Sequence, residues 1–569
     1  MKLSLSRLCS AALLVAFLTT GCGSGTTNNV LTPYAPAAVE GALSPQDVAL
    51  AQAMAQDPDV ATQLAPTANL NAMIAARSAT KTGTQAAATG ALTISVADLQ
   101  TNYQTLFCGL SDKLGVTITS PESVAKINYI RNQSGTGYFN LLNNPISNNA
   151  VGVTAVSFQP VTYQTTVPLP SGAQTFQVSG GLLMPLGISK AQIKGVVVYF
   201  HGTTFNKQMV GSNYSGNVET QLMAQVFASQ GYIVAIPDYV GQGVDWQDVH
   251  PYVLYPQVSA KTAVDMLAAV KPLIVSQYGF TGAEPALKLF STGYSEGGSY
   301  ALWFSTFISR TPGVLDTFYA LTHSMGCEGA YATSTVMKGF LFGDVQKSNG
   351  NIYNIQRQVL VNLVKPLLSA DAFLSYATYS VNSSWAGVFN MSFFNLDCEF
   401  LMPQGACDVL DEQVDIAEAF AKENTTIAKP LLFGALGKHA NGAIYPGLLE
   451  MLTSKSNSVN SLVSPILLTP TSQQQLDAAL QAADANLSAV ADQGASIITL
   501  SFDSVVVPNN FDSLLAAYPS KIRAAYRVNV DDLKVVSPFS VGVPMWVPVD
   551  HLHGLIYEFL YVLNTFNSF

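Results

Sequence analysis

The feature that most constrains the fold is a series of short, almost wholly apolar segments separated by helix-like stretches. Residues 195–200, 231–238 and 287–292 are such segments, and helical patterns cover residues 219–230 and 259–277 between them. A strand buried on both faces loses the in-and-out alternation of polar and apolar residues. The pattern therefore predicts an α/β fold whose mostly parallel sheet carries helices on both faces.

Composition excludes several other classes of protein. Hydrophobic residues make up 49% of the 569 residues and charged residues only 11%, against about 25% in ordinary globular proteins. The 26 basic and 36 acidic side chains leave a net charge of −10, so no basic face is expected for nucleic acid. After the first 22 residues no stretch of about 18 uninterrupted apolar residues occurs, which excludes a polytopic membrane protein.

A serine lies in a turn-forming motif directly after the third apolar segment. Residues 293–297 read Gly-Tyr-Ser-Glu-Gly, with Ser295 at the centre and a small-residue helix start behind it. In the context of strand, turn and helix, this motif presents a serine hydroxyl above the end of a parallel sheet. We expect Ser295 to be a nucleophile, the alternative being a tight turn without chemistry.

A serine nucleophile needs a base and an acid to orient that base. His551 lies at a late junction before the final helix and is the expected base, with His553 as the reserve. Asp503, after the late strand-like residues 496–500, is the expected acid. The chain order serine, acid, histidine is that of α/β-hydrolases. Three other acidic residues nearby, expected to be solvated, are Asp512, Asp531 and Asp532.

Amide donors for an oxyanion are expected at two places. Thr203 and Thr204 follow the first apolar strand, and Glu296 follows the nucleophile. His201, in the same loop as the threonines, is expected to hold the loop rather than to act as a base.

These motifs together resemble the secreted α/β-hydrolase lipases and esterases related to the secretory lipase family. The resemblance covers about residues 153–326 and 497–563. It implies an α/β-hydrolase fold and hydrolysis of carboxylic esters without a cofactor. It also implies that Asp238 and His250 shape the loops around the site. The motifs that carry it are residues 199–204, 228–232, 237–243 and 250–252 and the turn at Ser295.

The chain divides into five segments on this interpretation. Residues 1–22 are typical of a bacterial lipoprotein signal peptide and lipobox, and residues 23–150 of a tether or extension. Residues 151–329 and 491–569 form the two parts of the hydrolase core. Residues 330–490 are expected to form a mainly helical cap, whose apolar segments either line an acyl pocket or form the cap's own core.

The cysteines indicate an exported protein. Cys22 is the expected lipid attachment site, which predicts a lipoprotein at the outer membrane or cell surface; the alternative is a signal peptide with an incidental cysteine. Cys398 and Cys407 would close a short loop and are the first candidates for a disulfide. Cysteine and histidine lack zinc-ligand spacing, so no metal is expected.

Three functions are compatible with the motifs. The first is a serine hydrolase that cleaves small-molecule or lipid esters through an acyl-enzyme. The second is a serine peptidase, in which Glu296 could bind a free amino terminus. The third is a catalytically silent binding protein on the same scaffold, which the complete set of Ser295, Asp503 and His551 disfavours.

Overall fold

The computed structural model describes the hydrolase core and parts of its surroundings. These are residues 91–99, 151–204, 207, 210–246, 248–334, 336, 368, 371–373, 375–381, 470–501, 503, 505–506, 509–528, 534–536, 546–548 and 551–569. The predictions for the leader, for lipid attachment at Cys22 and for a Cys398–Cys407 disulfide lie outside these residues. So do most of the N-terminal extension and most of the expected cap. Cys327, within the described part, is a buried free thiol.

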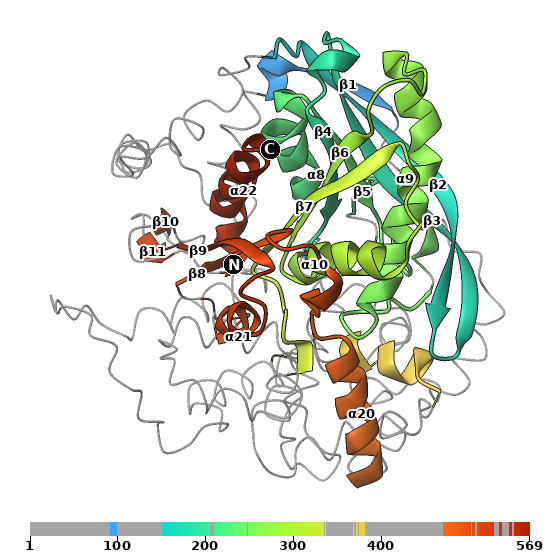
Figure 1. The fold of residues 1–569 in the computed structure, drawn as a ribbon, viewed down its shortest axis with the longest axis vertical. Coiled ribbons are helices and arrows are strands. Elements are labelled where there is room, and N and C mark those ends of the chain that lie inside the picture. Colours follow the sequence, from blue (N-terminus) through green and yellow to red (C-terminus); the bar gives the residue numbers. More distant parts are fainter. Residues whose placement is uncertain are drawn as a thin grey trace, which may run out of the picture.

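A nine-stranded sheet forms the centre of the molecule (Figure 1). Its order is β1-β2-β3-β5-β4-β6-β7-β8-β9; β1, β2, β3 and β5 pair antiparallel, and the strands from β5 to β9 pair parallel. The mostly parallel sheet confirms the prediction. The strands are β1 (Leu92–Ser95), β2 (Ala155–Leu169), β3 (Gly172–Leu186), β4 (Gly195–Phe200), β5 (Tyr232–Pro237), β6 (Leu287–Tyr294), β7 (Tyr319–Cys327), β8 (Ala495–Leu500) and β9 (Ile522–Val528).

Helices cover both faces of this sheet (Figure 1). Side chains of α8 and α22 share one apolar cluster with Val197 and Tyr199 of β4. Side chains of α9 and α10 share another with Val196 and Val198 of the same strand. This two-sided arrangement is the α/β-hydrolase fold. The helices are α8 (Val218–Val226), α9 (Pro256–Tyr278), α10 (Glu296–Arg310), α20 (Pro470–Ala482), α21 (Asn509–Ala517) and α22 (His551–Asn567).

Smaller elements complete the described part. Strands β10 (Lys534–Val536) and β11 (Trp546–Pro548) pair antiparallel in a separate sheet. Among the described residues, no helix combines the length and the hydropathy that crossing a bilayer requires. The 3₁₀ turns are η1 (Lys190–Gln192), η2 (Ala228–Gln230), η3 (Gly243–Asp245) and η6 (Leu487–Ala489).

Two glycines, Gly180 and Gly181, lie inside strand β3. Residues 179–181, Ser-Gly-Gly, suggest a turn between two strands, but they lie inside the 15-residue strand β3. A Cβ placed on Gly181 would lie 2.3 Å from the carbonyl oxygen of Gly211. The glycine is therefore needed for close backbone packing against the neighbouring loop, not for a change of chain direction.

Four described elements add to what the sequence patterns indicated. Strands β7 and β9 join the parallel part of the sheet without a clear local signal in the sequence. Strand β1, from the segment assigned to the N-terminal extension, pairs antiparallel with β2. Helix α20 comes from the segment assigned to the cap, and its Leu476 and Leu480 are buried in the core.

Helix α22 carries His551 as its first residue and is held to the sheet by aromatic packing. Phe559 is fully buried, and its ring centroid lies 5.3 Å from that of Tyr199 and 6.3 Å from that of Tyr294. Phe227 of the neighbouring segment adds a third ring at 6.4 Å. Such edge-to-face contacts add to the free energy of burying the ring itself.

Replacing Phe559 with alanine should therefore lower the free energy of unfolding by about 3–5 kcal/mol, because it removes a buried ring and leaves a cavity. Urea denaturation followed by circular dichroism measures this loss. Val381→Ala is the control, since Val381 is 62% exposed and its truncation should change stability by no more than about 0.5 kcal/mol. Equal stability of the two variants would contradict the packing described.

Candidate active site

Ser295 lies at the sharp turn between β6 and α10. Its backbone has φ +56° and ψ −119°, a conformation that residues other than glycine rarely adopt. The amide of Ser295 donates to the carbonyl of Cys327 at 2.9 Å, and the carbonyl of Ser295 accepts from Gly298 at 3.0 Å. These bonds fix a strained turn that holds the hydroxyl at the carboxyl end of the parallel strands.

The turn is possible because α10 starts in contact with β4. A Cβ on Gly297 would lie 1.9 Å from the carbonyl oxygen of Phe200, the last residue of β4. Only glycine leaves room for the helix start at this position. The second glycine of the motif is therefore required by packing between two elements.

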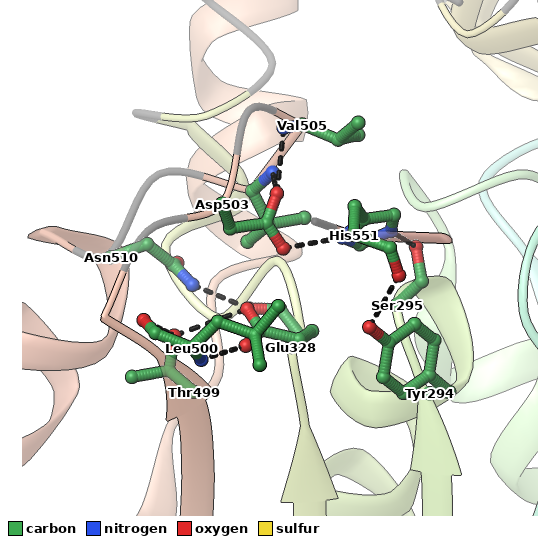
Figure 2. Close-up of polar contacts among 11 residues, drawn as sticks. Tyr294, Ser295, Glu328, Thr499, Leu500, Asp503, Val505, Asn510 and His551 are labelled. Carbon is green, nitrogen blue, oxygen red and sulfur yellow. Dashed lines mark hydrogen bonds and ion pairs between the residues drawn. The ribbon is translucent and has the colours of Figure 1, made fainter. Parts of the chain in front are cut away.

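The three residues predicted for nucleophile, base and acid form one hydrogen-bonded series (Figure 2). Ser295 Oγ lies 2.8 Å from His551 Nε2, and His551 Nδ1 lies 2.5 Å from Asp503 Oδ2. His551 and Asp503 are 5% and 2% exposed. In the neutral tautomer that this arrangement favours, Nδ1–H donates to Asp503 and Nε2 accepts from the hydroxyl of Ser295.

Further hydrogen bonds orient Asp503 and His551 within this series. Asp503 Oδ1 accepts from the amides of Val505 and Val506 at 2.6 and 2.8 Å, which leaves Oδ2 for the imidazole. The hydroxyl of Tyr294 donates to the carbonyl of His551 at 2.5 Å, so the residue next to the nucleophile fixes the first residue of α22.

Among the alternatives for base and acid, the structure describes the side chain of Asp512. His553 belongs to α22, but the structure does not describe its side chain. Asp512 is on α21 and pairs with Arg527 at the surface, at 2.5 Å. Asp531 and Asp532 lie outside the described residues. His551 and Asp503 are therefore the pair that the fold brings to Ser295.

The loop after β4 passes directly beside Ser295. A Cβ built on Gly202 would lie 3.8 Å from the Cβ of Ser295. The amide of Gly202 donates to Glu219 Oε2 at 2.9 Å, and the hydroxyl of Tyr199 donates to the same oxygen. Glu219 therefore occupies the Gly202 amide, and the predicted donors Thr203 and Thr204 follow Gly202 in the same loop.

Glu296 is adjacent to the nucleophile, but its side chain is engaged within the protein. Glu296 Oε1 lies 2.6 Å from His250 Nε2 and accepts from the hydroxyl of Tyr300 at 2.6 Å. The Glu296 and His250 side chains are 1% and 2% exposed. The Thr203 hydroxyl lies 3.3 Å from that of Tyr252, whose ring is 6.0 Å from the His250 ring, so aromatic residues link this pair to the loop after β4.

The other residues implied by the resemblance are structural. The ring of Tyr239 stacks between those of His201 and His250, at 4.0 and 5.2 Å between centroids. Burial lowers the pKa of His201 to about 4, so this imidazole is neutral near pH 7 and its Nδ1 bonds the Gly202 carbonyl. Asp238 is fully buried and accepts from the hydroxyls of Ser179 and Ser212, both at 2.6 Å.

Two buried carboxyl groups behind Asp503 were missed at the sequence level. Glu328 follows β7, and Glu558 is on α22; they are 1% and 0% exposed. A lone glutamate inside the apolar final helix is the one local signal that could have indicated Glu558. Nothing local marks Glu328, because its partners Thr499 and Leu500 lie more than 170 positions along the chain.

One group in the described part is compact enough to hold a metal ion. One potential ligand atom each of Glu328, Asp503 and His551 lies within 4.8 Å of the others. However, Asp503 and the His551 Nδ1 are hydrogen-bonded to each other, and Asp503 Oδ1 accepts from two amides. The donor set is therefore committed to hydrogen bonds, and the arrangement favours proton transfer at Ser295 over metal ligation.

Comparisons with known proteins add structural similarity only. No family model matches the chain, and no curated protein matches it. A solved hydrolase structure from Legionella pneumophila is similar at 16% identity over 84% of this chain and 98% of that chain, with a TM-score of 0.49. The rice cell wall degrading esterase LipA from Xanthomonas oryzae is similar at 16% identity over 75% of this chain and 94% of that chain, with a TM-score of 0.49. Candida antarctica lipase A in its closed state is similar at 12% identity over 74% of this chain and 79% of that chain, with a TM-score of 0.40.

Replacing Gly297 with alanine should destabilise the protein by about 3 kcal/mol or more, because its new Cβ would overlap the Phe200 carbonyl and force α10 away from β4. Thermal denaturation measures the change. Arg310→Ala, at the exposed end of the same helix, should shift stability by no more than about 0.5 kcal/mol. A Gly297 variant as stable as the Arg310 variant would show that the contact is not a constraint.

Proposed function

We propose that the chain is a serine hydrolase that cleaves carboxylic esters through an acyl-enzyme formed on Ser295. The observation that carries this proposal is the hydrogen-bonded series from Ser295 Oγ through His551 to Asp503. A serine hydroxyl becomes a strong nucleophile when a histidine takes its proton during attack. A buried carboxylate on the far nitrogen then stabilises the imidazolium that forms.

The proposed reaction has two stages, in which Ser295 is first acylated and then released by water. Ser295 Oγ attacks the ester carbonyl while its proton passes to His551 Nε2. His551 returns this proton to the leaving alcohol as the carbon–oxygen bond breaks, which leaves an acyl group on Ser295. Water then attacks the acyl carbonyl while its proton passes to His551, and His551 returns that proton to Ser295 Oγ as the bond to the acyl group breaks and the acid product leaves.

The negative oxygen of the tetrahedral intermediate requires amide donors. The amide of Glu296 follows the nucleophile at the start of α10, and the amides of Thr203 and Thr204 follow Gly202, which lies beside Ser295. We assign the oxyanion hole to these amides. Glu219 supports it by holding the Gly202 amide and thereby the path of the loop.

The state of Glu296 favours ester hydrolysis over the peptidase alternative. An enzyme that binds a free amino terminus needs an acidic side chain available to that amine. The Glu296 side chain is 1% exposed and already accepts from His250 and Tyr300. A substrate amine would have to displace these buried hydrogen bonds, at considerable cost in free energy.

The N-terminal sequence extends the proposal to location. Lipid attachment at Cys22 would anchor the enzyme at the outer membrane or the cell surface, where acyl esters of lipids are available. The apolar character of residues 330–490 supports an acyl substrate over a sugar or a highly charged one.

The purified protein should hydrolyse p-nitrophenyl acyl esters, and Ser295→Ala should lower kcat by about 10⁴-fold or more, because no nucleophile remains. Release of p-nitrophenol measures both. Ser299→Ala is the matched control, since Ser299 is a buried serine on the same helix; it should keep activity within about tenfold of the unaltered protein.

An acyl series from acetyl to palmitoyl then identifies the substrate class. Highest kcat/KM on long chains supports a lipid ester, and highest kcat/KM on short chains supports a small ester. Faster cleavage of aminoacyl p-nitroanilides than of any ester would favour the peptidase. Undiminished ester hydrolysis by the Ser295 variant would refute the assignment of the nucleophile.

A further inference from the structure

The carboxyl group of Glu328 lies beside the acid of the site and is not used in the mechanism above. One of its oxygens, one oxygen of Asp503 and one ring nitrogen of His551 all lie within 4.8 Å of one another (Figure 2). Two buried carboxyl groups therefore lie beside the imidazole, and Oδ2 of Asp503 contacts its Nδ1.

The surrounding structure holds Glu328 in this place. One carboxyl oxygen accepts from the amide of Leu500, and the other accepts from the hydroxyl of Thr499 at 3.1 Å. Both partners end β8, the strand that leads to Asp503. The Glu328 backbone has φ +46°, in the left-handed region that is strained for residues other than glycine. Strain of this kind persists only where the surroundings fix it.

Burial and two neighbouring acidic residues favour the protonated form of Glu328. Burial, followed by the neighbouring charges of Glu558 and Asp503, raises the pKa of Glu328 well above its ordinary value. Burial also raises the pKa of Glu558 to about 8. This direction favours the neutral form of Glu328, while Asp503 keeps the hydrogen bond to the imidazole.

The other titratable groups near this cluster are neutral as well. Burial raises their pKa values well above the ordinary ones, so they add no charge that could stabilise an ionised Glu328. These groups are Tyr294 of β6, Cys327 of β7 and Tyr331.

We propose that Glu328 is a positioning residue for Asp503 and the reserve acid of the site. While Asp503 is present, the Glu328 carboxyl lies beside it and holds the end of β8, the strand that leads to Asp503. When the Asp503 side chain is removed, Glu328 loses its proton and accepts the Nδ1–H of His551 instead. This inference rests on the proposed function.

Four proteins test the proposal: the unaltered chain, Asp503→Ala, Glu328→Gln and the double variant. Loss of the single acid of a serine hydrolase lowers kcat by about 10⁴-fold. With Glu328 in reserve, Asp503→Ala should lose only about 10²-fold and the double variant about 10⁴-fold. Glu328→Gln alone, which keeps the neutral hydrogen-bonding group, should lose less than about tenfold.

The pH profile supplies a readout that a purely structural role would not change. Activity of Asp503→Ala should require an ionised Glu328, whose pKa is raised by burial and by Glu558. The acid limb of its kcat/KM profile should therefore lie about one pH unit or more above that of the unaltered protein. The double variant should lack this limb.

Controls separate the proposal from loss of folding. Circular dichroism and thermal denaturation are recorded for every variant. If Asp503→Ala does not fold, Asp503→Ser replaces it, because the serine hydroxyl can accept from the amides of Val505 and Val506. Asp484→Asn, combined with Asp503→Ala, changes a carboxyl that is bonded to Ser334 instead of to this cluster. It should leave the activity of Asp503→Ala unchanged.

Two results would overturn the proposal. One is a loss of about 10⁴-fold for Asp503→Ala that Glu328→Gln does not increase, and the other is an acid limb that does not move. Failure of the proposed function is distinguishable, because it would appear as absent ester hydrolysis by the unaltered chain. The rate at which a fluorophosphonate probe labels Ser295 still compares the four proteins in that case.

Discussion

At the turn after β6, the first residues of α10 lie in van der Waals contact with the carbonyl of Phe200. This contact requires Gly297 and forces Ser295 into a strained conformation, so the hydroxyl has one fixed position above the sheet. The loop after β4 starts from the same carbonyl, which places Gly202 beside Ser295. Tyr294, before the nucleophile, binds the first residue of α22 and so sets the place of the imidazole.

The strand order explains why acidic groups gather behind that imidazole. Strands β6, β7 and β8 are neighbours and run parallel, so the residues that follow them meet at one edge of the sheet. Ser295, Glu328 and Asp503 follow these three strands in turn. A histidine from α22 then completes the constellation from above the same edge, which is where open α/β sheets bind their ligands.

Several buried acidic side chains lie at this edge of the sheet in a charge-poor protein. A buried charge is costly unless it is paired or hydrogen-bonded. The Asp503 carboxylate is bonded by two amides and an imidazole, and Glu296 is paired with His250. Glu328 avoids the cost by a different route, since burial favours its neutral form. The same low-dielectric surroundings make each of these bonds strong enough to fix an orientation.

Local sequence patterns determined the mostly parallel sheet, the turn at Ser295 and the choice of His551 and Asp503, because each depends on neighbouring residues or on chain order. Tertiary structure alone decided the rest. Gly181 looks like a turn residue until the close backbone of Gly211 is seen. Glu328 is recognised as part of the site only through its contacts with distant residues such as Thr499, 171 residues away. Contacts between distant segments leave no periodic trace in the sequence, since they arise only when the sheet brings its strand ends together.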